Sequence, residues 1–268
     1  MNELDGKVAV VTGAGNGIGR AIALAATRAG GRVVVADVLA ADGERTVREI
    51  QDEGGTAVFV PTDVSSDEQA RALVDTAVAT YGGLDVLVNN AGTGGAQARL
   101  HEVEPADFDR VIAVNLRGTY LCSKYALAHF LTRGGGGNIV NIASTYGLIG
   151  APAAPAYCAS KAAIINLTRQ LAVDYGPDGV RVNAVCPGYI DTGLGRRASA
   201  LSEEELGAAT ARREKAAGMQ PLGRQAQPAE VASVVVFLAT AGASFMTGSV
   251  VTVDGGCTTT FNYGEASN

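Results

Sequence analysis

Short runs of β-branched residues alternate along this chain with longer alanine-rich segments, and this alternation leaves few folds open. The short runs predict seven strands, at residues 7–12, 32–36, 57–60, 84–88, 138–143, 181–185 and 250–253. The segments between them have helical periodicity, near residues 18–29, 42–53, 67–81, 106–132, 156–175 and 228–240. Strands that alternate with helices in this way form right-handed βαβ units and therefore a parallel sheet.

The predicted strands are apolar throughout, whereas a strand with one solvated face would alternate apolar and polar residues. Helices are therefore expected on both faces of the sheet. We predict a single domain over residues 1–268, with an α/β fold built on a Rossmann-type, doubly wound parallel sheet of about seven strands. Residues 191–220 break the βα rhythm and contain a helical stretch at 203–217, so we interpret them as a substrate lid.

Charge and composition exclude several classes of protein. The net charge is −6, aromatic residues make up 5% and tryptophan is absent, so neither phosphate attraction nor base stacking favours nucleic acid. Apolar stretches reach only about ten residues, roughly half of a membrane span, and no secretory signal opens the chain. The four cysteines, Cys122, Cys158, Cys186 and Cys257, lack the spacing of a disulfide framework or a zinc site. We expect a cytoplasmic protein with no metal ion and no nucleic-acid or membrane partner.

The first predicted strand runs directly into a glycine-rich turn, Thr12-Gly13-Ala14-Gly15-Asn16-Gly17-Ile18-Gly19, and a helix follows. Glycine accepts the positive φ that a tight strand-to-helix turn needs, and a backbone without Cβ atoms can approach a pyrophosphate closely. The free N–H groups and the positive dipole end of the next helix favour the same anion. Glycine is common in this chain, so the position of the turn carries the prediction. We predict a dinucleotide site contacted by Gly13, Gly15, Asn16, Gly17, Ile18 and Gly19.

Asp37 follows the second predicted strand, 24 residues after Gly13. A carboxylate at this position accepts hydrogen bonds from the ribose hydroxyls of adenosine and repels a 2′-phosphate. No basic residue follows it directly, so NAD is favoured over NADP as the cofactor. The choice stays open at this point, because Arg20 and Arg32 are close enough in the sequence to reach a 2′-phosphate.

Two further groups of residues follow predicted strands, Asp63-Val64 after the third and Asn89-Asn90-Ala91-Gly92 after the fourth. Ligands of open α/β sheets bind outside the carboxyl ends of the strands. Both groups are therefore candidates for the same binding site. Taken alone, an aspartate helix cap and a glycine turn are the ordinary interpretations of these residues.

Tyr157 and Lys161 are four residues apart in a predicted helix, which places both side chains on one face. A lysine ammonium beside a phenol favours the phenolate and lowers its pKa from about 10, so this tyrosine could exchange a proton near neutral pH. Ser144, at the end of the fifth strand, could hydrogen-bond a substrate oxygen as charge develops there. Most Tyr-x-x-x-Lys pairs lie on protein surfaces, but the position of this one after a strand-terminal serine makes it a candidate catalytic site.

Taken together, these motifs resemble those of the classical short-chain dehydrogenase/reductase family, over roughly residues 4–256. The residues that carry the resemblance are Thr12–Gly19, Asp63, Asn89–Gly92, Asn115, Ser144, Tyr157, Lys161, Pro187-Gly188 and Val253–Gly256. No catalytic position departs from the family pattern. The resemblance implies a nicotinamide-dependent oxidoreductase and a homotetramer, in which the helices at 106–132 and 156–175 pair across a subunit interface.

The resemblance also implies roles for individual residues. Asn115 would hold a water in a proton relay to Lys161, and Lys161 would also hydrogen-bond the nicotinamide ribose. Pro187 and Gly188 would shape the nicotinamide pocket. Tyr157 is a further implied cofactor contact. Asp63 and Val64 would face the adenine, and Ile190 and Thr192 would contact the carboxamide. The remaining implied contacts are Asn90, Ala91 and Gly92, after the fourth strand.

These observations predict an NAD-dependent oxidoreductase that interconverts a secondary alcohol and a ketone by hydride transfer, with Tyr157 as general acid and base. Two alternatives stay open: an NADPH-dependent 3-oxoacyl reductase, for which Asp37 is the wrong residue, and a non-catalytic NAD-binding protein. Substrate specificity is expected to depend on residues 93–97, 145–152, Tyr189 and the lid. The only histidines, His101 and His129, lie in no motif and are assigned to surface or packing roles.

Overall fold

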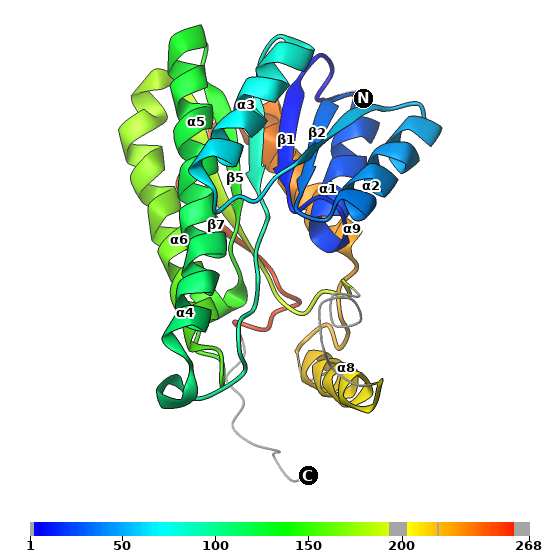
Figure 1. Cartoon of the computed structure of the whole chain (residues 1–268), viewed down its shortest axis with the longest axis vertical. Helices are drawn as coiled ribbons and strands as arrows, with labels where there is room; N and C mark the ends of the chain where they lie inside the picture. The colour runs from blue at the N-terminus through cyan, green and yellow to red at the C-terminus, as the bar shows by residue number, and fades with distance from the viewer. Residues whose placement is uncertain (1–2, 193–202, 219, 260–268) are drawn as a thin grey trace.

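The centre of the molecule is a seven-stranded parallel sheet, seen in a computed structural model that describes residues 3–192, 203–218 and 220–259 (Figure 1). The strands are β1 (Val8–Thr12), β2 (Arg32–Asp37), β3 (Thr56–Pro61), β4 (Val86–Asn89), β5 (Gly137–Ile142), β6 (Val180–Pro187) and β7 (Val250–Val253). Their order is β3-β2-β1-β4-β5-β6-β7, and each neighbouring pair is parallel. The predicted doubly wound fold is confirmed. The order reverses between β1 and β4, which is where such sheets bind ligands.

Helices cover both faces of the sheet. One layer holds α1 (Gly17–Arg28), α2 (Ala40–Asp52) and α9 (Pro228–Ala239), and the other holds α3 (Asp67–Tyr81), α4 (Pro105–Ile112), α5 (Gly118–Arg133) and α6 (Pro155–Tyr175). Successive residues of β2 explain why its sequence is apolar throughout. Val33 and Val35 lie in the core beneath α1 and α9, whereas Val34 lies in the core beneath α3 and α5. All three side chains are fully buried.

The long helix predicted at 106–132 is interrupted. α4 ends at Ile112, residues Ala113–Arg117 form a π-helical turn, and α5 begins at Gly118. The backbone N–H of Gly118 donates to the carbonyl oxygen of Ala113, five residues earlier, in place of the α-helical partner. Asn115 lies in the middle of this turn and is fully buried. Single π-turns inside α-helices are frequent at functional sites, so the interruption supports Asn115 as a candidate site residue.

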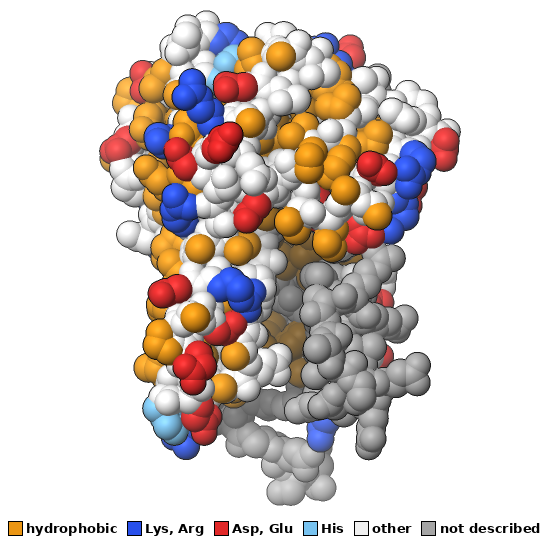
Figure 2. All heavy atoms as spheres, viewed as in Figure 1, with side chains coloured by type: hydrophobic (Ala, Val, Ile, Leu, Met, Phe, Trp, Pro, Cys, Tyr) orange, Lys and Arg blue, Asp and Glu red, His pale blue; other side chains and the backbone are white. Residues whose placement is uncertain are grey.

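The segment predicted to be a lid, 191–220, lies partly outside the described residues, because 193–202 and 219 are not among them. Its described part contains helix α8 (Glu203–Gly218), which lies apart from the sheet in Figure 1. The described residues also include 3₁₀ helices that the periodicity did not predict: η1 (Leu100–Glu102), η3 (Thr145–Gly147), η4 (Gly176–Asp178) and η5 (Ala241–Ala243). Among the helices of the described ranges, none is long and apolar enough to cross a bilayer. On the face shown in Figure 2, acidic and basic side chains are interspersed.

Candidate functional site

The glycine-rich turn joins the end of β1 to the start of α1, beside the end of β4. Gly13 has a φ of 62°, which favours glycine, and a Cβ at this position would come within 2.8 Å of the Ala91 Cα. A Cβ on Gly19 would overlap the Gly13 carbonyl oxygen and the Asn90 amide. Asn16 is the N-cap of α1, but its side chain accepts no hydrogen bond from the first N–H groups of the helix. A phosphate could therefore bind to bare backbone at the N-terminus of α1.

Thr12 and Asn90 connect this turn to β4. The Thr12 hydroxyl donates to the Val88 carbonyl (3.3 Å) and accepts from the N–H groups of Asn90 (3.0 Å) and Ala91 (3.1 Å). The Asn90 side-chain amide donates to the carbonyls of Thr12 (2.9 Å) and Gly13 (3.0 Å). These bonds fix the separation of β1 and β4 at the point where the strand order reverses. Sequence reasoning did not assign this role to Thr12, although a polar residue that ends a buried strand was a visible signal.

Asp37 is the last residue of β2, and its carboxylate faces the glycine-rich turn. One carboxylate oxygen accepts from the Gly15 N–H (2.8 Å), and the other accepts from the Leu39 N–H (2.9 Å). These bonds orient a carboxylate that is only 8% exposed. The position matches that of the acidic residue that binds the adenosine ribose in dinucleotide sites. Gly17 begins α1, and Ile18 packs against the core beneath it.

The two arginines considered for a 2′-phosphate are engaged elsewhere. Arg32 is the first residue of β2, whereas Asp37 is the last, so the two lie at opposite ends of the strand. The Arg32 guanidinium lies 5.4 Å from the centre of the Tyr81 ring, and the suggestion that it reaches a 2′-phosphate is wrong. Arg20 is in an ion pair, with its Nε donating to Glu49 at 2.7 Å.

A different arginine, Arg45 of α2, lies beside the turn. Its guanidinium donates to the Gly15 carbonyl (3.1 Å) and pairs with Asp42 (2.6 Å). Thr46 donates to the same Gly15 carbonyl (3.2 Å). Arg45 is 30 residues beyond Gly15 in the sequence, and no motif singles it out. A cation is therefore present near Asp37, but it already has a carboxylate partner.

Asp63 and Val64 follow β3 and are held by local contacts. One carboxylate oxygen of Asp63 accepts from the Ser65 N–H (2.9 Å) and the Ser65 hydroxyl (2.7 Å). Val64 is buried and lies so close to α5 that a Cβ on Gly118 would approach its side chain to 2.6 Å. The side chain of Val64 thus belongs largely to the core.

The predicted nicotinamide contacts follow β6. Pro187 ends this strand, and the Gly188 N–H donates to the Val253 carbonyl (3.0 Å) on β7. The Ile190 side chain is 3% exposed and lies in the core beneath α9. The Thr192 N–H donates to the Ile190 carbonyl (3.0 Å), and Thr192 is the last described residue before 203.

Ser144, Tyr157 and Lys161 come together at the end of β5. Ser144 lies two residues beyond the end of the strand and is the N-cap of η3, where its Oγ accepts from the Tyr146 N–H at 3.2 Å. The Tyr146 ring in turn packs edge-to-face against the Tyr157 ring, with centroids 6.2 Å apart. Tyr157 and Lys161 lie one turn apart on α6, and the Lys161 Nζ is 5.6 Å from the centre of the Tyr157 ring.

Lys161 is buried at the end of β5, where its Nζ donates to the carbonyl oxygen of Ile142 at 2.8 Å. Burial lowers the pKa of this ammonium to about 8, and the nearby Cys186 thiol acts in the opposite direction. Among the described residues, no carboxylate forms an ion pair with it. A buried cation of this kind is available to a neighbouring phenolate or to a ligand.

Asn115 connects the π-turn to β4 and α6. Its Oδ1 accepts from the Thr93 N–H (2.7 Å), and its Nδ2 donates to the Thr93 carbonyl (3.0 Å) and the Ser160 hydroxyl (3.0 Å). A Cβ on Gly92 would lie 3.3 Å from the Asn115 Oδ1 and 3.5 Å from the Lys161 Nζ, so the three residues converge. Thr93 and Ser160 hold Asn115 in place, and sequence reasoning missed this role of both.

Comparison with known proteins identifies this arrangement. A protein-family model described as enoyl-(acyl carrier protein) reductase matches residues 13–258. The crystal structure of a short-chain type dehydrogenase/reductase from Mycobacterium marinum superposes with a TM-score of 0.87 and 36% identity, covering 96% of this chain and 97% of that one. The chain belongs to the short-chain dehydrogenase/reductase family. The resemblance inferred from the sequence is thus confirmed.

Two curated members of the short-chain dehydrogenase/reductase family are similar over nearly their whole length. A cis-4-hydroxycyclohexanecarboxylate dehydrogenase of Sinomonas cyclohexanicum is 44% identical over 252 residues, covering 94% of this chain and 96% of the relative. A 2,5-dichloro-2,5-cyclohexadiene-1,4-diol dehydrogenase of Sphingobium indicum is 39% identical over 261 residues, covering 96% and 99%. Both are dehydrogenases, and the predicted enzyme class of this chain, an oxidoreductase, is confirmed.

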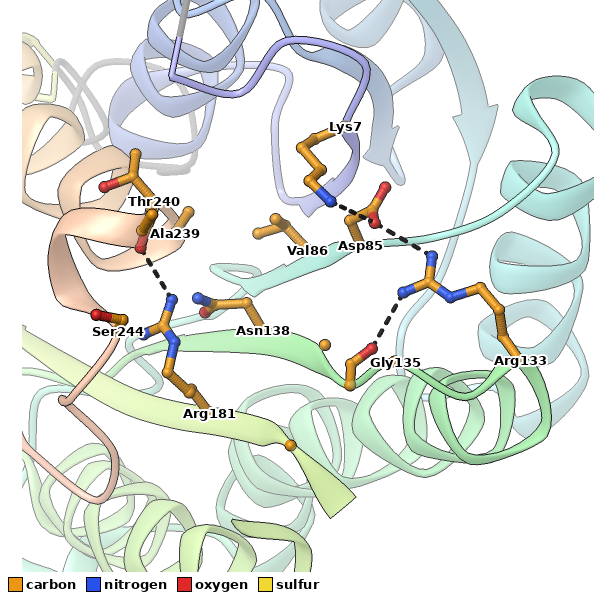
Figure 3. A pocket seen from close by; sticks show the side chains of 14 residues that line it. Lys7, Asp85, Val86, Arg133, Gly135, Asn138, Arg181, Ala239, Thr240 and Ser244 are labelled. Atoms are coloured by element: carbon orange, nitrogen blue, oxygen red, sulfur yellow. Dashed lines mark hydrogen bonds and ion pairs between the residues drawn. The ribbon is translucent and has the colours of Figure 1, made fainter. Parts of the chain in front are cut away.

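A cavity of about 230 Å³ lies at the other end of the sheet, at the amino ends of β4, β5 and β6 (Figure 3). Its walls include charged side chains, but these are engaged within the protein. Asp85 pairs with Lys7 (3.3 Å) and Arg133 (3.1 Å), and Arg181 donates to the carbonyls of Leu238 and Thr240. None of the predicted site residues lines this cavity. The residues that could perform the family's chemistry lie at the carboxyl ends of the strands.

The two histidines of this family member have the roles assigned from the sequence. His129 on α5 accepts the Leu84 N–H with its Nε2 at 3.1 Å, and burial lowers the pKa of its ring. His101 lies on η1 with its side chain 69% exposed. Packing and surface roles are therefore confirmed for them.

Proposed function

We propose that this protein is an NAD-dependent enzyme that interconverts a secondary alcohol and a ketone by hydride transfer. The observation that carries the proposal is the convergence of Ser144, Tyr157 and Lys161 at the end of β5, on the same sheet edge as the bare glycine turn. These three side chains can exchange a proton and stabilise an oxyanion, but none of them can accept a hydride. The chemistry therefore needs a hydride acceptor, and the turn at the N-terminus of α1 supports a dinucleotide in that role.

In oxidation, Tyr157 takes the hydroxyl proton of the alcohol onto its phenolate oxygen; in reduction, it returns a proton to the ketone oxygen. The ammonium of Lys161 beside the ring favours the phenolate. Ser144 accepts a hydrogen bond from the Tyr146 N–H, so its own proton remains to be donated to the substrate oxygen as charge develops. A nicotinamide held at the glycine turn would supply the hydride acceptor for the alcohol and the hydride donor for the ketone.

Asn115 is proposed to hold a water molecule in a proton relay that leads to Lys161. The support is positional, because Asn115 and Lys161 both approach Gly92. The bonds from Asn115 to Thr93 and Ser160 hold the π-turn against α6, where Lys161 lies. A water at the π-turn would thus be kept at a constant distance from the lysine.

NAD fits the residues around the glycine turn. Side chains at Gly13 and Gly19 would clash with the residues that follow β4, so the turn has no side chains at these two positions. The Gly15 N–H orients the Asp37 carboxylate towards the turn. The charge of Asp37 disfavours a 2′-phosphate, which supports NAD over NADP. The group that a 2′-phosphate would recruit is Arg45, and Asp42 competes for it.

The test is reduction of NAD or NADP, followed by absorbance, with a panel of secondary alcohols. Two relatives are named for six-membered-ring alcohols, so cyclic alcohols come first in the panel. We expect turnover with NAD. Asp37→Ser should shift preference towards NADP, while the exposed Asp52→Ser serves as the control and should not.

Turnover with NADP alone would overturn the cofactor assignment and keep the chemistry. NAD binding without turnover of any alcohol, or of any ketone with NADH, would favour a non-catalytic NAD-binding protein instead.

We further propose a homotetramer of cytoplasmic, single-domain subunits, each with a substrate lid at residues 191–220. Apolar side chains on α5 and α6 support a subunit interface there, since Leu131 is 47% and Val173 is 76% exposed. All four cysteines are free thiols, which agrees with a reducing compartment. Sedimentation should show four copies, and a stable monomer would contradict the assembly.

A further inference from the structure

Two tyrosine hydroxyls meet beside the candidate catalytic site without taking part in the proposed proton exchange. The Tyr146 hydroxyl lies 3.3 Å from the Tyr189 hydroxyl. Tyr146 belongs to η3, just after β5, and Tyr189 follows β6. Both side chains are half-buried, and together they are called the tyrosine pair below.

The tyrosine pair is fixed relative to the reacting groups. The Tyr146 N–H donates to Ser144, and its ring meets the Tyr157 ring at 88°. Tyr189 directly follows Pro187-Gly188, and its carbonyl accepts from the Ala226 N–H at 2.9 Å. The pair therefore lies at the carboxyl ends of β5 and β6, next to the serine and the candidate catalytic tyrosine.

The chemistry of the tyrosine pair suits an uncharged oxygen. Two phenols hold two protons, and only one of them is used in the bond between the two hydroxyls. Burial and the bond to Tyr189 raise the pKa of Tyr146, so the Tyr146 hydroxyl remains protonated at ordinary pH. In the part of the chain that the structure describes, neither hydroxyl has a hydrogen bond to a charged side chain. One O–H donor thus remains for a hydroxyl or keto oxygen.

Two partly exposed apolar residues lie close to Tyr146 in the sequence. Leu148 and Ile149 follow Tyr146 in the sequence and are 41% and 42% exposed. A hydrocarbon ring could cover these two side chains while one of its oxygens meets Ser144 and Tyr157. A second oxygen elsewhere on that ring would then need a polar partner.

We propose that Tyr146 and Tyr189 form a second polar subsite, which binds an uncharged second oxygen of a cyclic substrate. The preferred substrates are then cyclic diols and hydroxyketones, and a monohydric alcohol of the same ring is a poorer substrate. This inference rests on the proposed alcohol–ketone activity. It adds the substrate class and two residues that determine specificity.

The test compares kcat and KM for cyclohexanol and for the cyclohexanediols in wild type, Tyr146→Phe and Tyr189→Phe. Phenylalanine keeps the ring and the backbone N–H that donates to Ser144, and removes only the hydroxyl. Loss of one buried hydrogen bond corresponds to about tenfold in kcat/KM, so we expect about this loss for the preferred diol, mainly through KM. The value for cyclohexanol should stay within about twofold of wild type.

Tyr125→Phe is the matched control, because its hydroxyl donates to Asp67 on the surface, away from β5 and β6. It should change neither substrate. Equal losses for diol and cyclohexanol in the two pair variants would show that the tyrosine pair only supports the fold, and no loss for either would also overturn the proposal.

Binding separates this inference from the proposed activity. Calorimetry on the protein saturated with NADH should show tighter binding of the diol than of cyclohexanol in wild type, and no such difference in Tyr146→Phe. If wild type oxidises no alcohol, the proposed function fails, and this binding difference alone decides whether the subsite exists. Equal affinity for the diol and cyclohexanol in wild type would overturn it.

Discussion

The carboxyl end of the sheet and its amino end both contain basic side chains, yet these side chains have different partners. At the amino end, Lys7 and Arg133 share the carboxylate of Asp85, whose second oxygen accepts the Val8 N–H at 2.9 Å. At the carboxyl end, Lys161 has one backbone carbonyl as its hydrogen-bond acceptor and no carboxylate among the described residues. A charge that the protein leaves uncompensated marks a candidate site better than the residue type does.

The two ends also have opposite effects on the free energy of folding. Burial alone would raise the pKa of Asp85, but the Val8 hydrogen bond and the charges of Lys7 and Arg133 outweigh it, so the pKa is lowered. The ionised form of Asp85 therefore stabilises the fold. Burial lowers the pKa of Lys161, so its ionised form destabilises the fold. Stability is thus lost at the candidate active site and gained at the opposite end.

The largest expected effect is on catalysis at the carboxyl end. Tyr157→Phe should lower kcat by about 10²–10⁴-fold, because it removes the proposed acid and base. NAD affinity and the unfolding temperature should change little, since the ring remains in place. Steady-state kinetics, NAD titration and thermal unfolding check this. A variant with more than about a tenth of the wild-type rate would contradict the assigned role.

The next effect is the pH dependence that the buried ammonium gives to stability. Because burial lowers the pKa of Lys161 from its ordinary 10.5 to about 8, the folded protein holds fewer protons than the unfolded chain between these two pH values. Wild type should therefore gain roughly 3 kcal/mol relative to Lys161→Met as pH rises through this window. Denaturant unfolding at pH 7 and above pH 10 measures the gain. The exposed Lys215→Met is the control, and parallel curves for wild type and Lys161→Met would contradict the assignment.

A smaller effect is expected at the amino end. Asp85→Asn keeps the shape but removes the charge that Lys7 and Arg133 share, so stability at pH 7 should fall by about 2 kcal/mol. The values of kcat and KM should not change. Since the pKa of Asp85 is lowered, the difference between wild type and variant should disappear only as pH falls below its ordinary 3.8. A large loss of turnover in Asp85→Asn without a loss of stability would contradict a purely structural role for the amino end of the sheet.

The smallest effect concerns the space between Asn115 and Lys161. Gly92→Ala would place a methyl group 3.3 Å from the Asn115 Oδ1 and 3.5 Å from the Lys161 Nζ. These contacts are tight but not overlapping, so we expect kcat to fall about fivefold, which corresponds to about 1 kcal/mol. Gly94→Ala is the control, since a methyl group there meets nothing within 4 Å. Identical kcat values for the two variants would show that Gly92 does not contribute to the site.

Much of this arrangement could be predicted because parallel strands collect their carboxyl ends along one edge. Asp37, Asn90 and Ser144 each follow an apolar run, and the structure places all three at that edge. The strands could be predicted because helices cover both faces of the sheet. Val33 and Val34 point to opposite faces and are both buried, so polar residues do not alternate with apolar ones. Strand and helix ends differ from prediction by one or two residues, where local capping and pairing decide.

Other features depend on contacts between distant segments and could not be predicted in this way. The π-turn at Ala113–Arg117 has no glycine or proline that would distinguish it in the sequence from the α-helices on either side of it. The suggestion that Arg32 could reach a 2′-phosphate is wrong, because closeness in sequence ignores the length of the strand that separates it from Asp37. Arg45 reaches Gly15 only because α2 packs beside the turn, and α-helical periodicity does not specify that packing.

The π-turn has a consequence for how this segment tolerates insertion and deletion. Each residue advances an α-helix by about 100°, so the extra residue of the turn rotates α5 relative to α4. The two helices use this rotation, because α4 packs against α6 while α5 packs against α3. Deleting one residue from the turn would restore regular α-helical hydrogen bonds and rotate one of these helices away from its neighbour. Length is therefore fixed more strictly inside this helix than in the loop of residues 134–136, where three consecutive glycines have positive φ.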